Sequence, residues 1–247
     1  MDISLLQQSL DDLRCRILPG QPQLSLPSAA AADDADGDAD ADAQQRYERL
    51  EATRLLVGEA LAADPALTVR VADDVLPLLT LDDNLTSQLV FPLVAALGRR
   101  PVLTFLIAHS TSGSWQARTN SCAAAYWVDV WRSTTRRAEI IAATRQGTLT
   151  REQARTLLQQ DAHQPYWRTS DHVSDLWPSL WAAAADAFVR CQDNELRQRL
   201  QSAFPLDAAH YPPGHGRLLH QARTVAEAMP DLFGRLLADR SGYGTVI

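Results

Sequence analysis

The sequence predicts an all-α fold, built as an irregular array of antiparallel helical hairpins. The stretch from Leu85 to Trp131 alternates long apolar runs with short polar interruptions, a pattern typical of helices that face a core. Apolar residues also recur at helical spacing throughout residues 44–239. No stretch alternates apolar and polar residues convincingly with the period of two that marks a β-strand.

The N-terminal part of the chain divides into a helix and an acidic linker. Residues 3–17 predict a short amphipathic helix, which Pro19 and Gly20 end. Residues 29–43 contain six aspartates and no basic residue, so they have too little apolar surface to offset the entropy of ordering. The predicted units are an N-terminal amphipathic helix over 1–18, a flexible linker rich in Ala and Asp over 19–43, and a single helical domain over 44–247.

Residues that favour helix starts and helix ends mark the predicted helix boundaries in the helical domain. Asp64 is a candidate N-cap, and Pro65 follows it at the first helical position. Gly98 can end the helix that contains the first apolar run, and Pro101 can start the next. Thr150-Arg-Glu-Gln153 has the pattern of a capping box. The expected helices cover, in order, 44–61, 65–81, 85–97, 101–108, 115–131, 151–160, 171–191, 194–204, 217–229 and 231–239.

Three of these helices share a short signature around Arg54, Arg118 and Arg197. The arginine directly follows an apolar or small residue, and further apolar or small residues lie four and eight positions after that first residue. This resembles the second helix of HEAT-like repeats, in which the arginine fixes the turn between paired helices. The resemblance covers about half of the chain and implies a HEAT-like α-solenoid of stacked hairpins. An irregular helical bundle is the alternative, because the intervals of 64 and 79 residues between the arginines give no clean repeat period.

The charge of the chain lies mainly in the linker. The net charge is −7, yet residues 44–247 hold 21 acidic residues and 21 arginines. A balanced body predicts neither nucleic acid nor an anionic membrane as a partner. All 23 basic residues are arginine, which is typical of codon bias in a GC-rich bacterial genome. Neither a signal peptide nor a transmembrane helix is expected, so the cytoplasm is the expected location.

The cysteines and acidic residues predict no metal, no cofactor and no disulfide framework. Cys15, Cys122 and Cys191 are far apart, and their spacing fits no zinc motif. The aspartates of the linker resemble a calcium loop only in part, because Ala32 and Ala43 stand where the first and twelfth ligands are needed. No P-loop or dinucleotide-binding glycine motif occurs.

The tryptophans are the first candidate binding residues. Trp127 and Trp131 form one pair with a spacing of four, and Trp177 and Trp181 form a second, each beside a run of alanines. Residues with this spacing share one helix face. The favoured interpretation is core packing, in which alanine lets a neighbouring helix approach and tryptophan fills the remaining volume. The alternative is a partly exposed aromatic groove for a peptide or small ligand.

The second candidate is a basic segment. Residues 132–155 contain six arginines against Glu139 and Glu152, a net charge of +4. One interpretation is a solvated helical hairpin. The other is a surface that binds an acidic partner, a phosphate-bearing ligand or the chain's own Asp-rich linker. The arginines assigned to this surface are Arg132, Arg136, Arg137 and Arg145.

The sequence contains no complete catalytic constellation, and no catalytic residue is assigned. Stacked hairpins form extended surfaces, so we expect a non-enzymatic protein-interaction or regulatory module of the bacterial cytoplasm, with another protein as its partner. That protein is acidic under the second interpretation of the basic segment. The alternative is an enzyme with a dispersed site in the Trp-rich region, in which His109 or His172 acts as acid or base. The serines after His109 form no GxSxG elbow and instead predict a loop that caps the helix from Trp115. The oligomeric state stays open.

Overall fold

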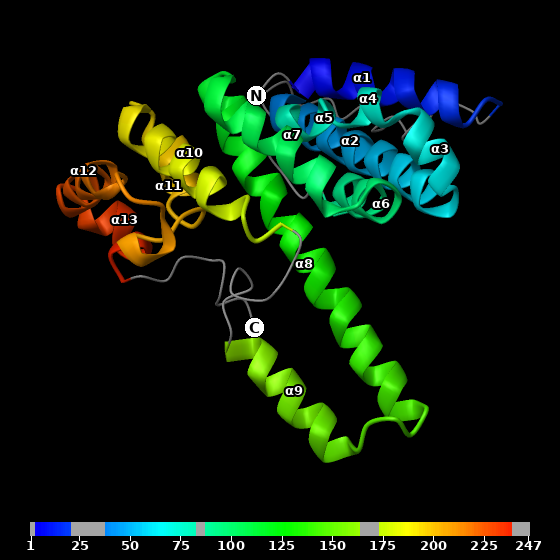
Figure 1. Ribbon diagram of the computed structural model, residues 1–247. Helices are drawn as coiled ribbons and strands as arrows, with labels where there is room; N and C mark the ends of the chain where they lie inside the picture. The colour runs from blue at the N-terminus through cyan, green and yellow to red at the C-terminus, as the bar shows by residue number, and fades with distance from the viewer. Residues whose placement is uncertain (1–2, 21–37, 83–86, 164–172, 239–247) are drawn as a thin grey trace.

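The computed structural model describes residues 3–20, 38–82, 87–163 and 173–238, with the backbone alone described at 3, 38–43, 131–138 and 158–163 (Figure 1). Every regular element in these ranges is a helix, which confirms the predicted all-α fold. The elements are α1 (Ile3–Ile17), α2 (Asp38–Ala63), α3 (Pro65–Arg70), α4 (Ala72–Val75), α5 (Leu78–Leu81), α6 (Ser87–Leu97), α7 (Arg99–Ser112), α8 (Trp115–Arg145), α9 (Arg151–His163), α10 (Trp177–Arg190), α11 (Asn194–Leu200), the 3₁₀-helix η2 (Ala208–His210), α12 (Gly216–Glu227) and α13 (Pro230–Leu237).

The N-terminal helix is part of the core. Helix α1 packs against α2, and its Leu6, Leu10 and Leu13 are buried. The predicted helix boundaries agree with α1, but the linker prediction is wrong at its end, because α2 already begins at Asp38. Alternating aspartate and alanine suit a first helical turn, since carboxylates interact favourably with the helix dipole there. The linker residues 21–37 lie outside the described residues.

The single helix expected over 65–81 is divided into the short helices α3, α4 and α5. The chain leaves helical geometry at Val71, where φ is −107° and ψ is 10°. Pro77 then precedes α5 and has no N–H group to continue the ladder of hydrogen bonds. The apolar periodicity predicts a helical segment here, but it does not show where the backbone turns.

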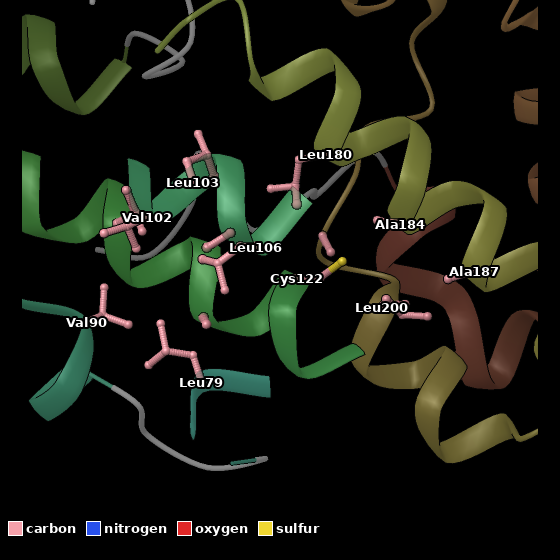
Figure 2. Close-up of a cluster of buried hydrophobic side chains, with 14 of the residues drawn as sticks. Leu79, Val90, Val102, Leu103, Leu106, Cys122, Leu180, Ala184, Ala187 and Leu200 are labelled. Atoms are coloured by element: carbon pink, nitrogen blue, oxygen red, sulfur yellow. The ribbon is translucent and has the colours of Figure 1, made fainter. Parts of the chain in front are cut away.

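The core lies where helices from both halves of the chain meet α7 and α8 (Figure 2). Helices α5, α6, α10 and α11 pack against α8, and α6 and α10 also pack against α7. The side chains in Figure 2 include Leu79, Val90, Val102, Leu103, Leu106, Cys122, Leu180, Ala184, Ala187 and Leu200. Hairpins that follow one another along the chain therefore share one continuous apolar interior.

Two of the three signature arginines join a helix to the end of the helix before it. Arg118 of α8 donates from Nε to the carbonyl oxygen of Ser110, 2.7 Å away in the last turn of α7. Arg197 of α11 donates from Nε to the carbonyl oxygen of Phe188, 3.0 Å away near the end of α10. The last four carbonyls of a helix lack partners within it, so a buried guanidinium satisfies them. Arg118 also donates to Asp186 at 2.9 Å and so ties α8 to α10.

Arg54, the third signature arginine, has a different role. Its fully buried guanidinium lies between Glu51 and Asp82, and Asp82 is itself buried directly after α5. A second pair, Arg99 with Asp129 at 3.2 Å, joins the start of α7 to α8, and both side chains are less than one tenth exposed. Ion pairs taken out of water must be well matched to be tolerated, so these contacts define which helices can lie together.

The caps predicted from the sequence are present. Asp64 accepts a hydrogen bond from the backbone N–H of Leu67 at 2.9 Å, and Ser114 accepts one from Ala117 at 3.2 Å. Thr150 and Gln153 form the reciprocal capping box, with distances of 2.9 and 3.1 Å. The helix starts at Pro65, Trp115 and Arg151 were therefore correctly located.

Gly58 sets the distance between α2 and α6. A Cβ atom there would lie 2.6 Å from the carbonyl oxygen of Gln88, which belongs to the backbone and cannot move away by rotation. We expect Gly58→Ala to lower the free energy of unfolding by about 1–3 kcal/mol, because the helices must separate. Chemical denaturation would measure the change. Gly234→Ala is the control, since nothing lies within 4 Å of its added methyl group, and it should be neutral or stabilising. Equal effects of both substitutions would contradict the proposed contact.

Helix α8 extends well beyond the core. It has 31 residues, which corresponds to about 45 Å, whereas the sequence predicted its end near Trp131. Its second half runs out of the body, and α9 returns alongside it (Figure 1). We call residues 131–163 the projecting hairpin. Among the described helices, none combines the length and the apolar character needed to span a bilayer.

Candidate interaction site

The projecting hairpin carries the basic segment singled out in the sequence. Arg145 stands at the end of α8, and Arg151 and Arg155 lie on the first turns of α9. All three side chains are exposed, as are Glu139 and Glu152. The guanidinium groups are therefore accessible at the tip of the hairpin, where α8 and α9 have left the body of the molecule (Figure 1).

The hairpin has a small core of its own. In its described part, Ile140 of α8 and Ala154 of α9 are the buried hydrophobic residues. Leu149 and Leu157 are half-buried, and Ile141 is 40% exposed. Within the described part of the chain, α8 is the helix against which α9 packs. The described side chains of the hairpin bury little apolar surface, so additional burial on one face would stabilise it.

The part of α8 where the projecting hairpin begins contains four of the predicted site residues. Trp131, Arg132, Arg136 and Arg137 belong to α8, and their side chains lie outside the described residues. The helix places their backbone between the core and the tip. The contact predicted between this segment and the chain's own linker also stays a prediction, because residues 21–37 are outside the described ranges.

Trp127 marks the point where α8 leaves the core. Its ring is half-buried and packs edge-on against Phe91 of α6, with centroids 6.0 Å apart. Tyr126 lies beside it, at 5.1 Å. The indole therefore packs partly against the core, and part of it stays exposed near the base of the hairpin. This geometry is compatible with both interpretations of the first tryptophan pair.

The second tryptophan pair is buried. Trp177 is 2% exposed and Trp181 is 1% exposed, and their rings stack with centroids 6.3 Å apart. His210 and Tyr211 approach Trp181 edge-on from the segment after α11. The groove interpretation is therefore wrong for Trp177 and Trp181, because no ring surface is open to a ligand. Sequence spacing shows that two rings share a face, but it cannot show whether another segment covers that face.

The groups considered for catalysis are engaged in local packing where they are described. His109 places Nδ1 3.0 Å from the carbonyl oxygen of Phe105 and stacks on the Phe105 ring. His172 lies outside the described residues. Burial raises the pKa of the Cys122 thiol to about 12, although Arg118 lowers it slightly, so this thiol is not a nucleophile near neutral pH. The described residues contain no group of three His, Cys, Asp or Glu side chains placed to hold a metal ion.

One hollow was not anticipated from the sequence. An open pocket of about 390 Å³ lies between α1 and α2, and polar and charged residues line it. Arg49 and Asp11 pair across it at 3.0 Å, so two of its charges already neutralise each other. The spacing of the polar residues on α1 was a usable signal, because they fall on one helix face. The lining residues are Ser4, Gln7, Gln8, Asp11, Asp12, Arg46 and Arg49.

Comparisons with protein-family models, with curated proteins and with solved structures found no match to this chain.

Proposed function

We propose that this protein is a non-enzymatic interaction module of the bacterial cytoplasm, and that the projecting hairpin binds an acidic surface of a partner protein. The observation that carries the proposal is a helical hairpin that leaves the core and presents Arg145, Arg151 and Arg155 to solvent. Extended helices held away from a body serve as recognition elements when their exposed face complements a partner in charge and shape.

The small core of the hairpin supports the same proposal. Ile141 is exposed beside the arginines, and the described part of the hairpin buries little apart from Ile140 and Ala154. A partner that covers Ile141 would add apolar burial, and its carboxylates would pair with the guanidinium groups. Binding would then stabilise the hairpin and fix its direction relative to the body.

The body acts in this proposal as a HEAT-like stack that holds the hairpin. Arg118 and Arg197 support this assignment, since each bonds to carbonyls of the preceding helix. Arg54 makes side-chain ion pairs instead, and so departs from the pattern. A stack of hairpins would hold the first half of α8 in place, because several helices pack against that half.

The charge of the hairpin provides a direct test. We expect a fluorescently labelled poly-glutamate peptide to bind the full chain at low ionic strength. Arg145→Glu/Arg151→Glu/Arg155→Glu should weaken this binding by about ten-fold or more, because exposed charge contacts contribute about 0.2–1 kcal/mol each. Fluorescence anisotropy would measure the affinity.

A matched triple variant distinguishes the effect of the hairpin arginines from the effect of the protein's net charge. Arg217→Glu/Arg223→Glu/Arg235→Glu makes the same charge change at exposed positions of α12 and α13. It should leave most of the binding intact. An equal loss in both variants would show that only net charge matters, and the proposed site would be abandoned. Binding of inorganic pyrophosphate in preference to poly-glutamate would instead favour a phosphate-bearing ligand.

A further inference from the structure

The pocket between α1 and α2 has the size of a site for a small molecule. Its volume of about 390 Å³ falls within the usual range of such sites, about 300–1,000 Å³. The two helices run antiparallel along it, because Gln7 contacts Thr53 and Asp11 contacts Arg49. The aliphatic stems of the arginines and glutamines that line the pocket supply carbon surface between its polar groups.

One polar atom of this pocket is buried without a partner among the described residues. The side-chain nitrogen of Gln7 donates to Asp11 at 3.0 Å and to the hydroxyl of Thr53 at 3.3 Å. That hydroxyl itself donates to the carbonyl oxygen of Arg49, so it can only accept from Gln7, and the orientation of the amide is fixed. The amide oxygen Oε1 of Gln7 is buried and accepts no hydrogen bond within the described part of the chain. A buried acceptor without a donor costs free energy, so this atom favours a ligand with an N–H or O–H group.

The charged residues of the pocket are not all used in the same way. Asp11 and Arg49 form an ion pair at 3.0 Å. Asp12 is exposed, and its carboxylate pairs with no described residue. Arg46 is exposed as well, and a guanidinium has five N–H donors, enough to bind a carboxylate besides its contacts within the chain. Because the helices are antiparallel, Arg46 lies one turn beyond Arg49 in the direction of Asp12, at the end of the pocket away from Gln7.

We propose that this pocket binds a free α-amino acid whose side chain carries a hydrogen-bond donor, such as L-glutamine. The carboxylate of the amino acid binds the guanidinium of Arg46, and its ammonium group binds the carboxylate of Asp12. Its side chain extends along α1 and donates to Oε1 of Gln7. Gln7 and Asp12 are five residues apart on α1, about 7.5 Å along the helix axis, a span suited to an amino acid with an extended side chain. The site is separate from the projecting hairpin, so the inference goes beyond the proposed function.

Isothermal titration calorimetry of the full-length protein with L-glutamine tests the inference. We expect one molecule to bind per chain and to raise the melting temperature, because the ligand binds only the folded protein. Two analogues test the charged contacts, since 4-aminobutanamide lacks the carboxylate and glutaramic acid lacks the ammonium group. Each should bind about ten-fold more weakly or worse, because each loses a charge-assisted hydrogen bond. L-Methionine has a side chain of the same length without a donor, so it should also bind more weakly than L-glutamine.

Substitutions in the pocket assign the residues. Asp12→Asn and Arg46→Gln should each weaken the binding of L-glutamine by about ten-fold or more. Glu59→Gln and Arg70→Gln are the matched controls, because they neutralise the same kinds of charge at exposed positions of α2 and α3 outside the pocket. Both controls should bind as the unaltered chain does. The melting temperature of each variant without ligand shows that its fold is intact.

Three results would overturn the inference. The first is no binding at millimolar concentration of L-glutamine, nor of L-asparagine or L-serine, whose shorter side chains also carry a donor; water alone would then satisfy Oε1 of Gln7. The second is equal affinity for L-glutamine and its two analogues. The third is unchanged binding in both Asp12→Asn and Arg46→Gln, which would place the amino acid elsewhere.

The inference and the proposed function can fail separately. Arg145→Glu/Arg151→Glu/Arg155→Glu changes the projecting hairpin and should bind L-glutamine as the unaltered chain does. Asp12→Asn and Arg46→Gln change the pocket and should leave most of the binding of poly-glutamate intact. Loss of L-glutamine binding in the hairpin variant would contradict a site between α1 and α2.

Discussion

Replacing Asp82 by alanine is expected to lower the free energy of unfolding by about 3–5 kcal/mol. Asp82 is 1% exposed, and its two carboxylate oxygens lie 2.8 and 3.1 Å from nitrogen atoms of Arg54. The substitution leaves the buried guanidinium without its main counter-charge, and Glu51, which is half-buried, can balance it only from one side. Urea denaturation followed by circular dichroism would measure the loss.

Two comparisons make this test specific. Asp74→Ala removes one partner of the exposed pair with Arg16, and should change the stability by no more than about 1 kcal/mol. Arg54→Met/Asp82→Leu removes both buried charges, and should recover much of the loss, because no uncompensated ion remains. If Asp82→Ala behaves like Asp74→Ala, the pair does not hold α2 against the end of α5.

Replacing Trp181 by alanine is expected to cost about 3–5 kcal/mol, as large-to-small substitutions in a core do. The indole is 1% exposed and contacts the rings of Trp177, His210 and Tyr211. The cavity left behind would also release the segment around η2, which packs over α10 through those rings. Thermal and chemical unfolding would both report the change.

Trp115 is the natural control for this substitution. It is 39% exposed, and its ring lies 4.7 Å beneath the guanidinium carbon of Arg118. Trp115→Ala should cost about 1 kcal/mol or less, which is the magnitude of an exposed cation–π contact. A Trp181→Ala protein that keeps its melting temperature but loses binding to a partner would restore the groove interpretation for this tryptophan.

The position of α1 affects how the linker can be studied. Removing residues 1–43 would delete Leu6, Leu10 and Leu13, which are buried against the rest of the fold. Loss of stability would then mask any effect of the acidic residues. Substitution of Asp33, Asp34 and Asp36 by asparagine changes the charge of the linker and leaves α1 in place.

Features that depend on residues close together in the chain could be predicted from the sequence. Asp64, Ser114 and the Thr150–Gln153 capping box lie where the pattern predicted them, because a cap depends on a side chain and backbone groups two or three residues away. The helical class was predictable for the same reason, since periodicity is a property of each segment. The basic segment could also be found, because charge is counted along the chain.

The sequence by itself thus determined the helical class, most helix starts and the charge of the candidate site. Only the tertiary structure decided that Trp177 and Trp181 are covered, that Arg54 meets Asp82, and that α8 continues past Trp131 into a projecting hairpin. These features depend on which segments approach each other in space. Burial and ion pairing between distant residues arise from packing of whole helices, which no local spacing records.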